Sequence, residues 1–160
     1  MSNFKIMTMK KIFAISLLGL LFFSAGMNAQ SKKTTQADLD FNKKLVTDFY
    51  QKIFGDKDFM NIDHYLLPNY IQHNPNVADG AEAFETAIKG WLKGTPKTKV
   101  DVQHIVAEGD LVFIHIKNVL PDGKLLSVID IFRIEDKKIA EHWDVHETVP
   151  EKSANNHPMF

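Results

Sequence analysis

The chain has 160 residues, with 19 Lys and Arg against 20 Asp and Glu, and no Cys. A formal net charge of −1 excludes the basic excess typical of nucleic-acid-binding proteins, and the lack of Cys excludes disulfides. The length is that of one ordinary globular domain.

The N-terminal stretch 1–29 has the three parts of a secretory signal peptide. Lys residues precede an apolar run at 12–23, and small residues follow that run as far as Ala29. The run is short for a membrane span, which needs about 20 apolar residues. We therefore predict cleavage after Ala29 and a secreted or periplasmic protein, with Met1 or Met9 as the start. An uncleaved membrane anchor is the alternative.

Residues 30–37 are polar and predict a flexible lead-in to a folded domain over 38–160. Thr35 followed by Asp38 resembles a capping box, and apolar residues continue from there at helical spacing. The pattern predicts helices over 35–54, 58–66 and 79–94, with a short extended segment at 69–75.

The second half of the chain has the pattern of strands. They are predicted over 99–107, 111–119, 125–134 and 138–148. Helices followed by an antiparallel meander predict an α+β fold. Because the strands are apolar on both faces, we expect helices to cover one face and a second subunit to cover the other. A sheet twisted tightly around its helices would form a cone with a closed-in pocket.

The last predicted hairpin contains an acid among apolar residues. Asp130 shares one side of its strand with Val128, Phe132 and Ile134. Burying a lone carboxylate costs several kcal/mol, so Asp130 is expected to be paired, protonated or at a cavity.

The neighbours of Asp130 depend on the hairpin turn. We favour a three-residue turn at 135–137, which places Asp130 opposite His142 and requires a left-handed Lys137. A two-residue turn would place Trp143 opposite Asp130 instead, since a one-residue slip reverses every side chain. The favoured register leaves an apolar outer face for a homodimer contact, formed by Ile129, Ile131 and Trp143.

Several segments together resemble the SnoaL-like group of the nuclear-transport-factor-2-like (ketosteroid isomerase-like) superfamily. They are Tyr70–Pro75 with Asp79-Gly80, Asp130–Ile134, Lys138–Val145, and Met159-Phe160 after Asn156. The resemblance runs from Leu39 to the C-terminus. It implies a cone-shaped α+β barrel, usually dimeric, with a pocket between the helices and the curved sheet.

In polyketide cyclases of this group, an aspartate on the third long strand is the acid/base for an intramolecular aldol closure. Asp130 matches that position, and the resemblance implies no metal or organic cofactor. Lys137 stands where the group usually has Gly in the turn.

The candidate catalytic residues are Asp130, His142 and His73. Burial would raise the pKa of Asp130 towards neutrality, and His142 could orient it or relay a proton. Each has a structural alternative. Asp130 could be a carboxylate held by its neighbours, His142 a core histidine with its hydrogen bonds satisfied, and His73 a histidine of the loop. The expected pocket lining consists of Asp144, His115, Tyr50, Tyr70, Trp91, Phe113 and Phe132. His115 faces Asp130 only if the loop at 121–124 has four residues, and His104 is assigned no role.

A metal site is the minority interpretation. His73, His115, His142 and Asp144 could converge, but they lack the H-x-H or H-E-x-x-H spacing of metal ligands, and we expect no metal. The sequence therefore predicts a cofactor-independent acid/base enzyme for a small apolar carbonyl compound, of the aldol-cyclisation or isomerisation type. A non-catalytic small-molecule-binding or protein-interaction module is the alternative. Neither interpretation involves nucleic acid, or a membrane after cleavage.

Overall fold

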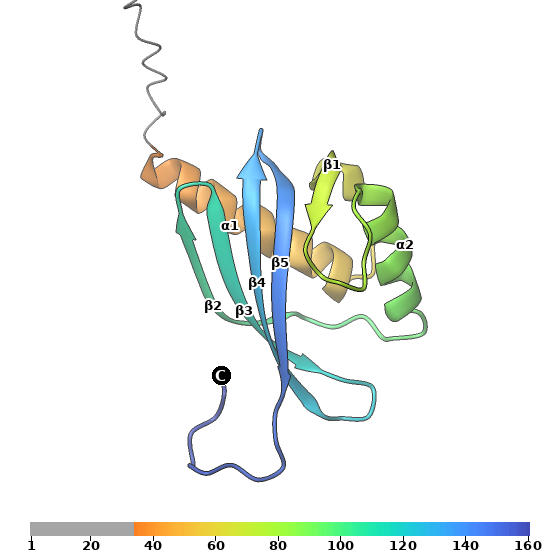
Figure 1. The fold of residues 1–160 in the computed structure, drawn as a ribbon, viewed down its shortest axis with the longest axis vertical. Coiled ribbons are helices and arrows are strands. Elements are labelled where there is room, and N and C mark those ends of the chain that lie inside the picture. The colour runs from red at the N-terminus through yellow and green to blue at the C-terminus, as the bar shows by residue number, and fades with distance from the viewer. Residues whose placement is uncertain (1–33) are drawn as a thin grey trace, which may run out of the picture. The chain divides into compact units, whose positions relative to one another are not determined.

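The computed structural model describes residues 34–160, in which two helices pack on a five-stranded mixed sheet (Figure 1). The predicted α+β class is confirmed. The predicted signal peptide 1–29 lies outside the described residues. No helix described in 34–160 is long and apolar enough to cross a membrane.

The first helix, α1 (Gln36–Tyr50), begins where the capping box predicts. The Thr35 hydroxyl accepts the backbone N–H of Asp38 at 3.2 Å, and the Asp38 carboxylate accepts the backbone N–H of Thr35 at 2.9 Å. A π-helical turn, η1 (Gln51–Gly55), follows directly. A Cβ at Gly55 would lie 2.8 Å from the carbonyl oxygen of Thr98, so the close approach of these two segments requires glycine.

The predicted helix over 58–66 is wrong. Only a 3₁₀ turn, η2 (Ile62–His64), forms there, and the edge strand β1 (Leu66–Gln72) begins at Leu66. Short apolar runs fit a helix or a strand equally well, which explains the error. Pro68 lies within β1, where an edge strand tolerates its missing N–H.

The second helix, α2 (Ala81–Trp91), begins later than predicted. The carboxylate of Asp79 does not cap it but accepts the backbone N–H of Gln72 at 2.8 Å. Trp91 is 54% exposed, so it cannot belong to the predicted lining of a closed-in pocket, whereas Phe84 and Ile88 on the same helix are buried.

The remaining strands form the predicted antiparallel meander. They are β2 (Asp101–Glu108), β3 (Leu111–Val119), β4 (Leu125–Glu135) and β5 (Lys138–Thr148). The sheet order is β1-β5-β4-β3-β2, with β1 parallel to β5. The parallel β1 was not expected, and it brings the segment after residue 66 alongside the start of β5.

The β4–β5 hairpin differs from the favoured prediction in two ways that compensate. Asp136 and Lys137 have φ of 49° and 62°, which is a two-residue turn of type I′ geometry. Beyond the turn, Ile134 pairs with Ile139 but Arg133 pairs with Glu141, so Ala140 is an extra residue in a bulge. The two-residue turn and the bulge each shift the register of β5 by one residue. Because each shift reverses the direction of the side chains, the two together return the side chains of β5 to the predicted faces.

The resulting register pairs Asp130 with Asp144 and Phe132 with His142. The predicted pairing of Asp130 with His142 is therefore wrong by two residues, but all of these side chains share the inner face. This face and the helices enclose the core. Its largest fully buried side chains are Tyr70, Phe49, Ile53, Leu66, Ile88, Ile114, Ile139, Val46 and Val112.

Candidate active site

Asp130 is a buried carboxyl group in the middle of the inner face, with a side chain only 4% exposed. Its Oδ1 atom lies 3.0 Å from His142 Nε2, whereas Oδ2 is buried without a hydrogen-bond partner in the described residues. Burial raises the pKa of Asp130, and its hydrogen bond with His142 opposes that rise. A carboxyl group with one paired and one free oxygen can exchange a proton at the free oxygen.

His142 lies diagonally from Asp130 on β5 and is also buried. Its ring stacks on Phe132 with centroids 4.8 Å apart, which fixes the plane of the imidazole. Its second nitrogen, Nδ1, lies 2.8 Å from Oε1 of Gln72. The contact predicted between His142 and Asp130 is present, although the register that was expected to produce it is not.

Asp144 lies directly across the strand pair from Asp130, and its negative charge contributes to the raised pKa of Asp130. Its Oδ2 atom accepts the side-chain amide of Asn74 at 2.6 Å and lies 2.7 Å from Nε2 of His146. Asp144 thus joins the site as predicted, with both partners holding its carboxylate in place.

Gln72, Asn74 and His146 are site residues that sequence reasoning missed. Gln72 and Asn74 reach the site because β1 runs parallel to β5, with Gln72 opposite His142. The available signal was the polar segment before Pro75, where alternate residues share one side of an extended chain.

His73 points away from Asp130, so its predicted place in the site is wrong. Between Gln72 and Asn74, it projects to the opposite side of the extended chain. Its Nε2 atom lies 2.8 Å from Oε1 of Glu141, and its ring stacks on Trp143 at 4.6 Å. Glu141 also accepts a hydrogen bond from Arg133 on the outer face, and these partners lower its pKa, Arg133 first and His73 second.

His115 and Phe113 also lie on the outer face, so neither lines a site around Asp130. Val119 pairs with Leu125, which leaves a five-residue loop where four were assumed. The extra residue places Ile114 opposite Asp130 and turns His115 outward, where Nε2 lies 2.8 Å from Oγ of Ser127.

The other residues predicted to line the pocket differ in how deeply they are buried. Trp91 is exposed, as stated above, whereas Tyr50, Tyr70 and Phe132 are buried in the core. The hydroxyl of Tyr70 accepts a hydrogen bond from Nε2 of Gln72 at 3.0 Å, and burial raises the pKa of Tyr70. Tyr70 and Phe132 therefore contact the site from the core, Tyr70 through Gln72 and Phe132 through the ring of His142.

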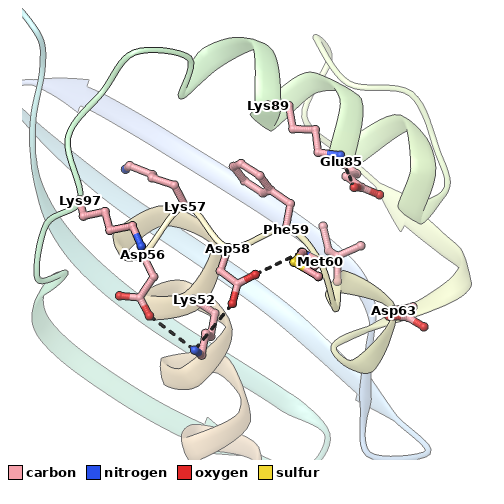
Figure 2. A pocket seen from close by; sticks show the side chains of 11 residues that line it. Lys52, Asp56, Lys57, Asp58, Phe59, Met60, Asp63, Glu85, Lys89 and Lys97 are labelled. Carbon is pink, nitrogen blue, oxygen red and sulfur yellow. Dashed lines mark hydrogen bonds and ion pairs between the residues drawn. The ribbon is translucent and has the colours of Figure 1, made fainter.

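Two hollows in the described part of the chain have linings that do not include Asp130. The larger, of about 810 Å³, lies beside η1, the following loop and α2 (Figure 2). It is lined by Lys52, Asp56, Lys57, Asp58, Phe59, Met60, Ile62, Asp63, Glu85, Lys89 and Lys97. Lys52 and Lys89 are engaged in ion pairs with acids of the same hollow. The second hollow, of about 620 Å³, lies around the start of α2. The predicted closed-in pocket at Asp130 is neither of these two hollows.

Asp130, His142 and Asp144 are the groups in the described residues that could hold a metal ion, with one donor atom from each within 4.8 Å of the others. The larger set weighed from the sequence does not assemble, because His73 and His115 face outward. Two donors of the smaller set, His142 Nε2 and Asp130 Oδ1, are already hydrogen-bonded to each other. A proton therefore satisfies this pair without an ion.

We expect purified protein to contain far less than one equivalent of metal, because an ion would have to displace the proton between His142 and Asp130. Inductively coupled plasma mass spectrometry on protein dialysed without chelator measures this. About one equivalent of zinc or manganese, lost in Asp130→Asn, would contradict the expectation.

The SnoaL-like polyketide cyclase model matches residues 44–151, which is more than half of the chain and contains every residue of the site. The chain belongs to this family. The resemblance seen in the sequence is thereby confirmed. No curated protein matches the chain.

Solved structures share the fold of this SnoaL-like protein. TsrD from Streptomyces laurentii is 25% identical with a TM-score of 0.58, over 72% of this chain and 92% of TsrD. A candidate polyketide cyclase from Bacillus cereus is 18% identical with a TM-score of 0.60, over 71% of this chain and 79% of its own. An epoxide hydrolase of the LEH-like type from M. tuberculosis is 18% identical with a TM-score of 0.57, over 69% and 85%. The fold is thus shared by proteins described as different kinds of enzyme.

Proposed function

We propose that this SnoaL-like protein is a cofactor-independent acid/base enzyme that acts on a small, largely apolar carbonyl compound. One observation carries the proposal: among residues 34–160, Oδ2 of Asp130 is a buried oxygen without a hydrogen-bond partner, on a carboxyl group whose other oxygen bonds His142. Leaving a buried polar atom unpaired costs about 1–3 kcal/mol, and such atoms call for an explanation by function.

The proposed step is removal of a proton from the carbon next to the substrate carbonyl. The C–H bond breaks, an O–H bond forms at Asp130 Oδ2, and the electron pair forms an enolate. Attack of the enolate on a second carbonyl group would give an aldol cyclisation, and return of the proton to another carbon would give an isomerisation. Apolar neighbours such as Phe132 favour the neutral carboxyl group, which suits a base that must hold the proton it has taken.

Comparison of wild type with Asp130→Asn tests this function, using turnover and ligand affinity on carbonyl compounds that bind the purified protein. Affinity without any turnover would instead support the non-catalytic binding module. Export of the protein remains a further proposal, which rests on the predicted signal peptide 1–29.

We also propose a homodimer through the outer face of the sheet. Ile129 and Val145 pair across β4 and β5 on this face and are 45% and 67% exposed. Their neighbours Ile131 and Trp143 extend the apolar surface along the same two strands. Exposed apolar surface of this kind is typical of a face that a partner covers.

Ile129→Glu is expected to convert the dimer to a monomer, because it places a charge in the middle of the proposed contact. Sedimentation velocity of wild type and variant measures the change. Met60→Glu is the matched control, since Met60 is 89% exposed and lies at the larger hollow. A monomeric wild-type protein would rule out the proposed dimer.

A further inference from the structure

The side-chain amide of Gln72 is held in one orientation. Its Oε1 atom accepts the backbone N–H of Asn74 at 2.9 Å, and its Nε2 atom donates to the hydroxyl of Tyr70 at 3.0 Å. A backbone N–H can only donate, so it distinguishes the amide oxygen from the amide nitrogen. The atom of Gln72 that faces His142 is therefore the oxygen.

An amide oxygen that faces Nδ1 of His142 at 2.8 Å requires a hydrogen on that nitrogen. In the neutral ring, Nε2 then carries the lone pair and faces Asp130 Oδ1 at 3.0 Å. We infer that Gln72 is a positioning residue, which holds His142 in the Nδ1–H form so that Nε2 can accept a proton from Asp130.

This inference rests on the proposed function and adds a second proton transfer, from Asp130 to His142. When Oδ2 takes the proton from carbon, the proton on Oδ1 moves to Nε2 of His142. The O–H bond on Oδ1 breaks and an N–H bond forms on Nε2, so Asp130 keeps a single proton and His142 becomes cationic. The opposite tautomer, with hydrogen on Nε2, could not accept this proton.

Asn74, two residues after Gln72 and on the same side of the extended chain, fixes the hydrogen bonding of Asp144 in a similar way. Its Oδ1 atom accepts the backbone N–H of Asn76 at 2.9 Å, which turns its Nδ2 atom towards Asp144. Asp144 therefore stays an acceptor opposite Asp130, and the resulting negative charge favours a proton on the Asp130–His142 pair. The polar residues before Pro75 thus determine where the protons of the site lie.

Nuclear magnetic resonance of protein labelled with ¹⁵N at histidine tests the inference, because the two ring nitrogens have different shifts in each tautomer. Neutral His142 is expected to show hydrogen on Nδ1 in wild type. Gln72→Leu removes the acceptor and is expected to give a mixture of tautomers or hydrogen on Nε2. Gln103→Leu is the matched control, since the side chain of Gln103 donates to the exposed Asp101 nearby and lies outside the site.

Gln72→Glu is the rescuing variant. Its carboxylate keeps an acceptor at Nδ1 and can accept a hydrogen from the hydroxyl of Tyr70, so the Nδ1–H form should persist. The added negative charge should move the titration of the His142 signals to higher pH than in wild type. If Gln72→Leu does not fold, the titration of the His142 signals in Gln72→Glu tests the inference by itself. An unchanged titration in that variant would overturn the inference.

The inference and the proposed function can fail separately. Hydrogen on Nε2 in wild type, or an unchanged tautomer in folded Gln72→Leu, would overturn the positioning role whatever the activity. Full turnover by Asp130→Asn would overturn the proposed function and leave the tautomer result standing.

Discussion

Asp130→Asn is expected to abolish measurable turnover and to leave ligand affinity nearly unchanged. Asn has the shape of Asp and can donate its amide N–H to Nε2 of His142, but it cannot take up a proton. General acid/base groups contribute about 10²–10⁴-fold to rate, so kcat should fall by at least that range. Steady-state kinetics and isothermal titration calorimetry with the same ligand measure the two quantities.

His73→Gln is the matched control for this loss. His73 lies beside the site in sequence, but its ring contacts Glu141 and Trp143 on the outer face. Its replacement should leave kcat within about threefold of wild type, since surface changes of this kind have small effects. Turnover lost equally in both variants would point to a general disturbance of the sheet and not to proton transfer by Asp130.

Asp130→Asn also tests a pH dependence of the stability of the wild-type protein. Burial raises the pKa of folded Asp130 above its ordinary value of 3.8, so the folded state binds this proton more tightly than the unfolded state. The contribution to stability is complete below pH 3.8 and declines as the pH rises towards the folded-state pKa. Asp130→Asn should lack this decline, so its free energy of unfolding should rise relative to wild type as the pH increases.

Phe49→Ala is expected to lower the free energy of unfolding by about 3–5 kcal/mol, because it leaves a large cavity in a packed core. Phe49 is 1% exposed on α1, and its ring contacts both the helices and the sheet. Its ring neighbours are Tyr50, Phe54, Tyr65, Phe84 and Phe132. Urea unfolding followed by circular dichroism measures the loss.

Phe41→Ala on the same helix is the comparison. Phe41 is 42% exposed and meets the ammonium group of Lys137 at 5.7 Å from its ring centre. An exposed contact of this type contributes about 0.5–1 kcal/mol, so the loss should be small. Equal losses in the two variants would show that Phe49 is not the centre of the core.

The sequence was sufficient for the elements that have strong local patterns. The meander and the capped first helix appear where the strand pattern and the Thr35–Asp38 pair predict them. The apolar surroundings of Asp130 also identified the buried acid, because one strand's alternation is enough to show which residues share its side.

The rest depended on pairing between distant segments. Nothing near Leu66 shows that this segment joins β5 in parallel, so Gln72 and Asn74 could not be placed beside His142 and Asp144. The face of His115 depended on one residue in a loop. Such a residue changes no local pattern but reverses a whole strand.

The bulge at Ala140 separates the choice of turn from the side chains that face inward. With the two-residue turn alone, β5 would present Trp143 to the core and leave His142 and Asp144 in solvent. One additional residue, placed between the turn and the site, corrects the phase of the strand without changing either. The hairpin can therefore use a two-residue turn of Asp136 and Lys137, both with positive φ, while the side chains on the inner face stay in register.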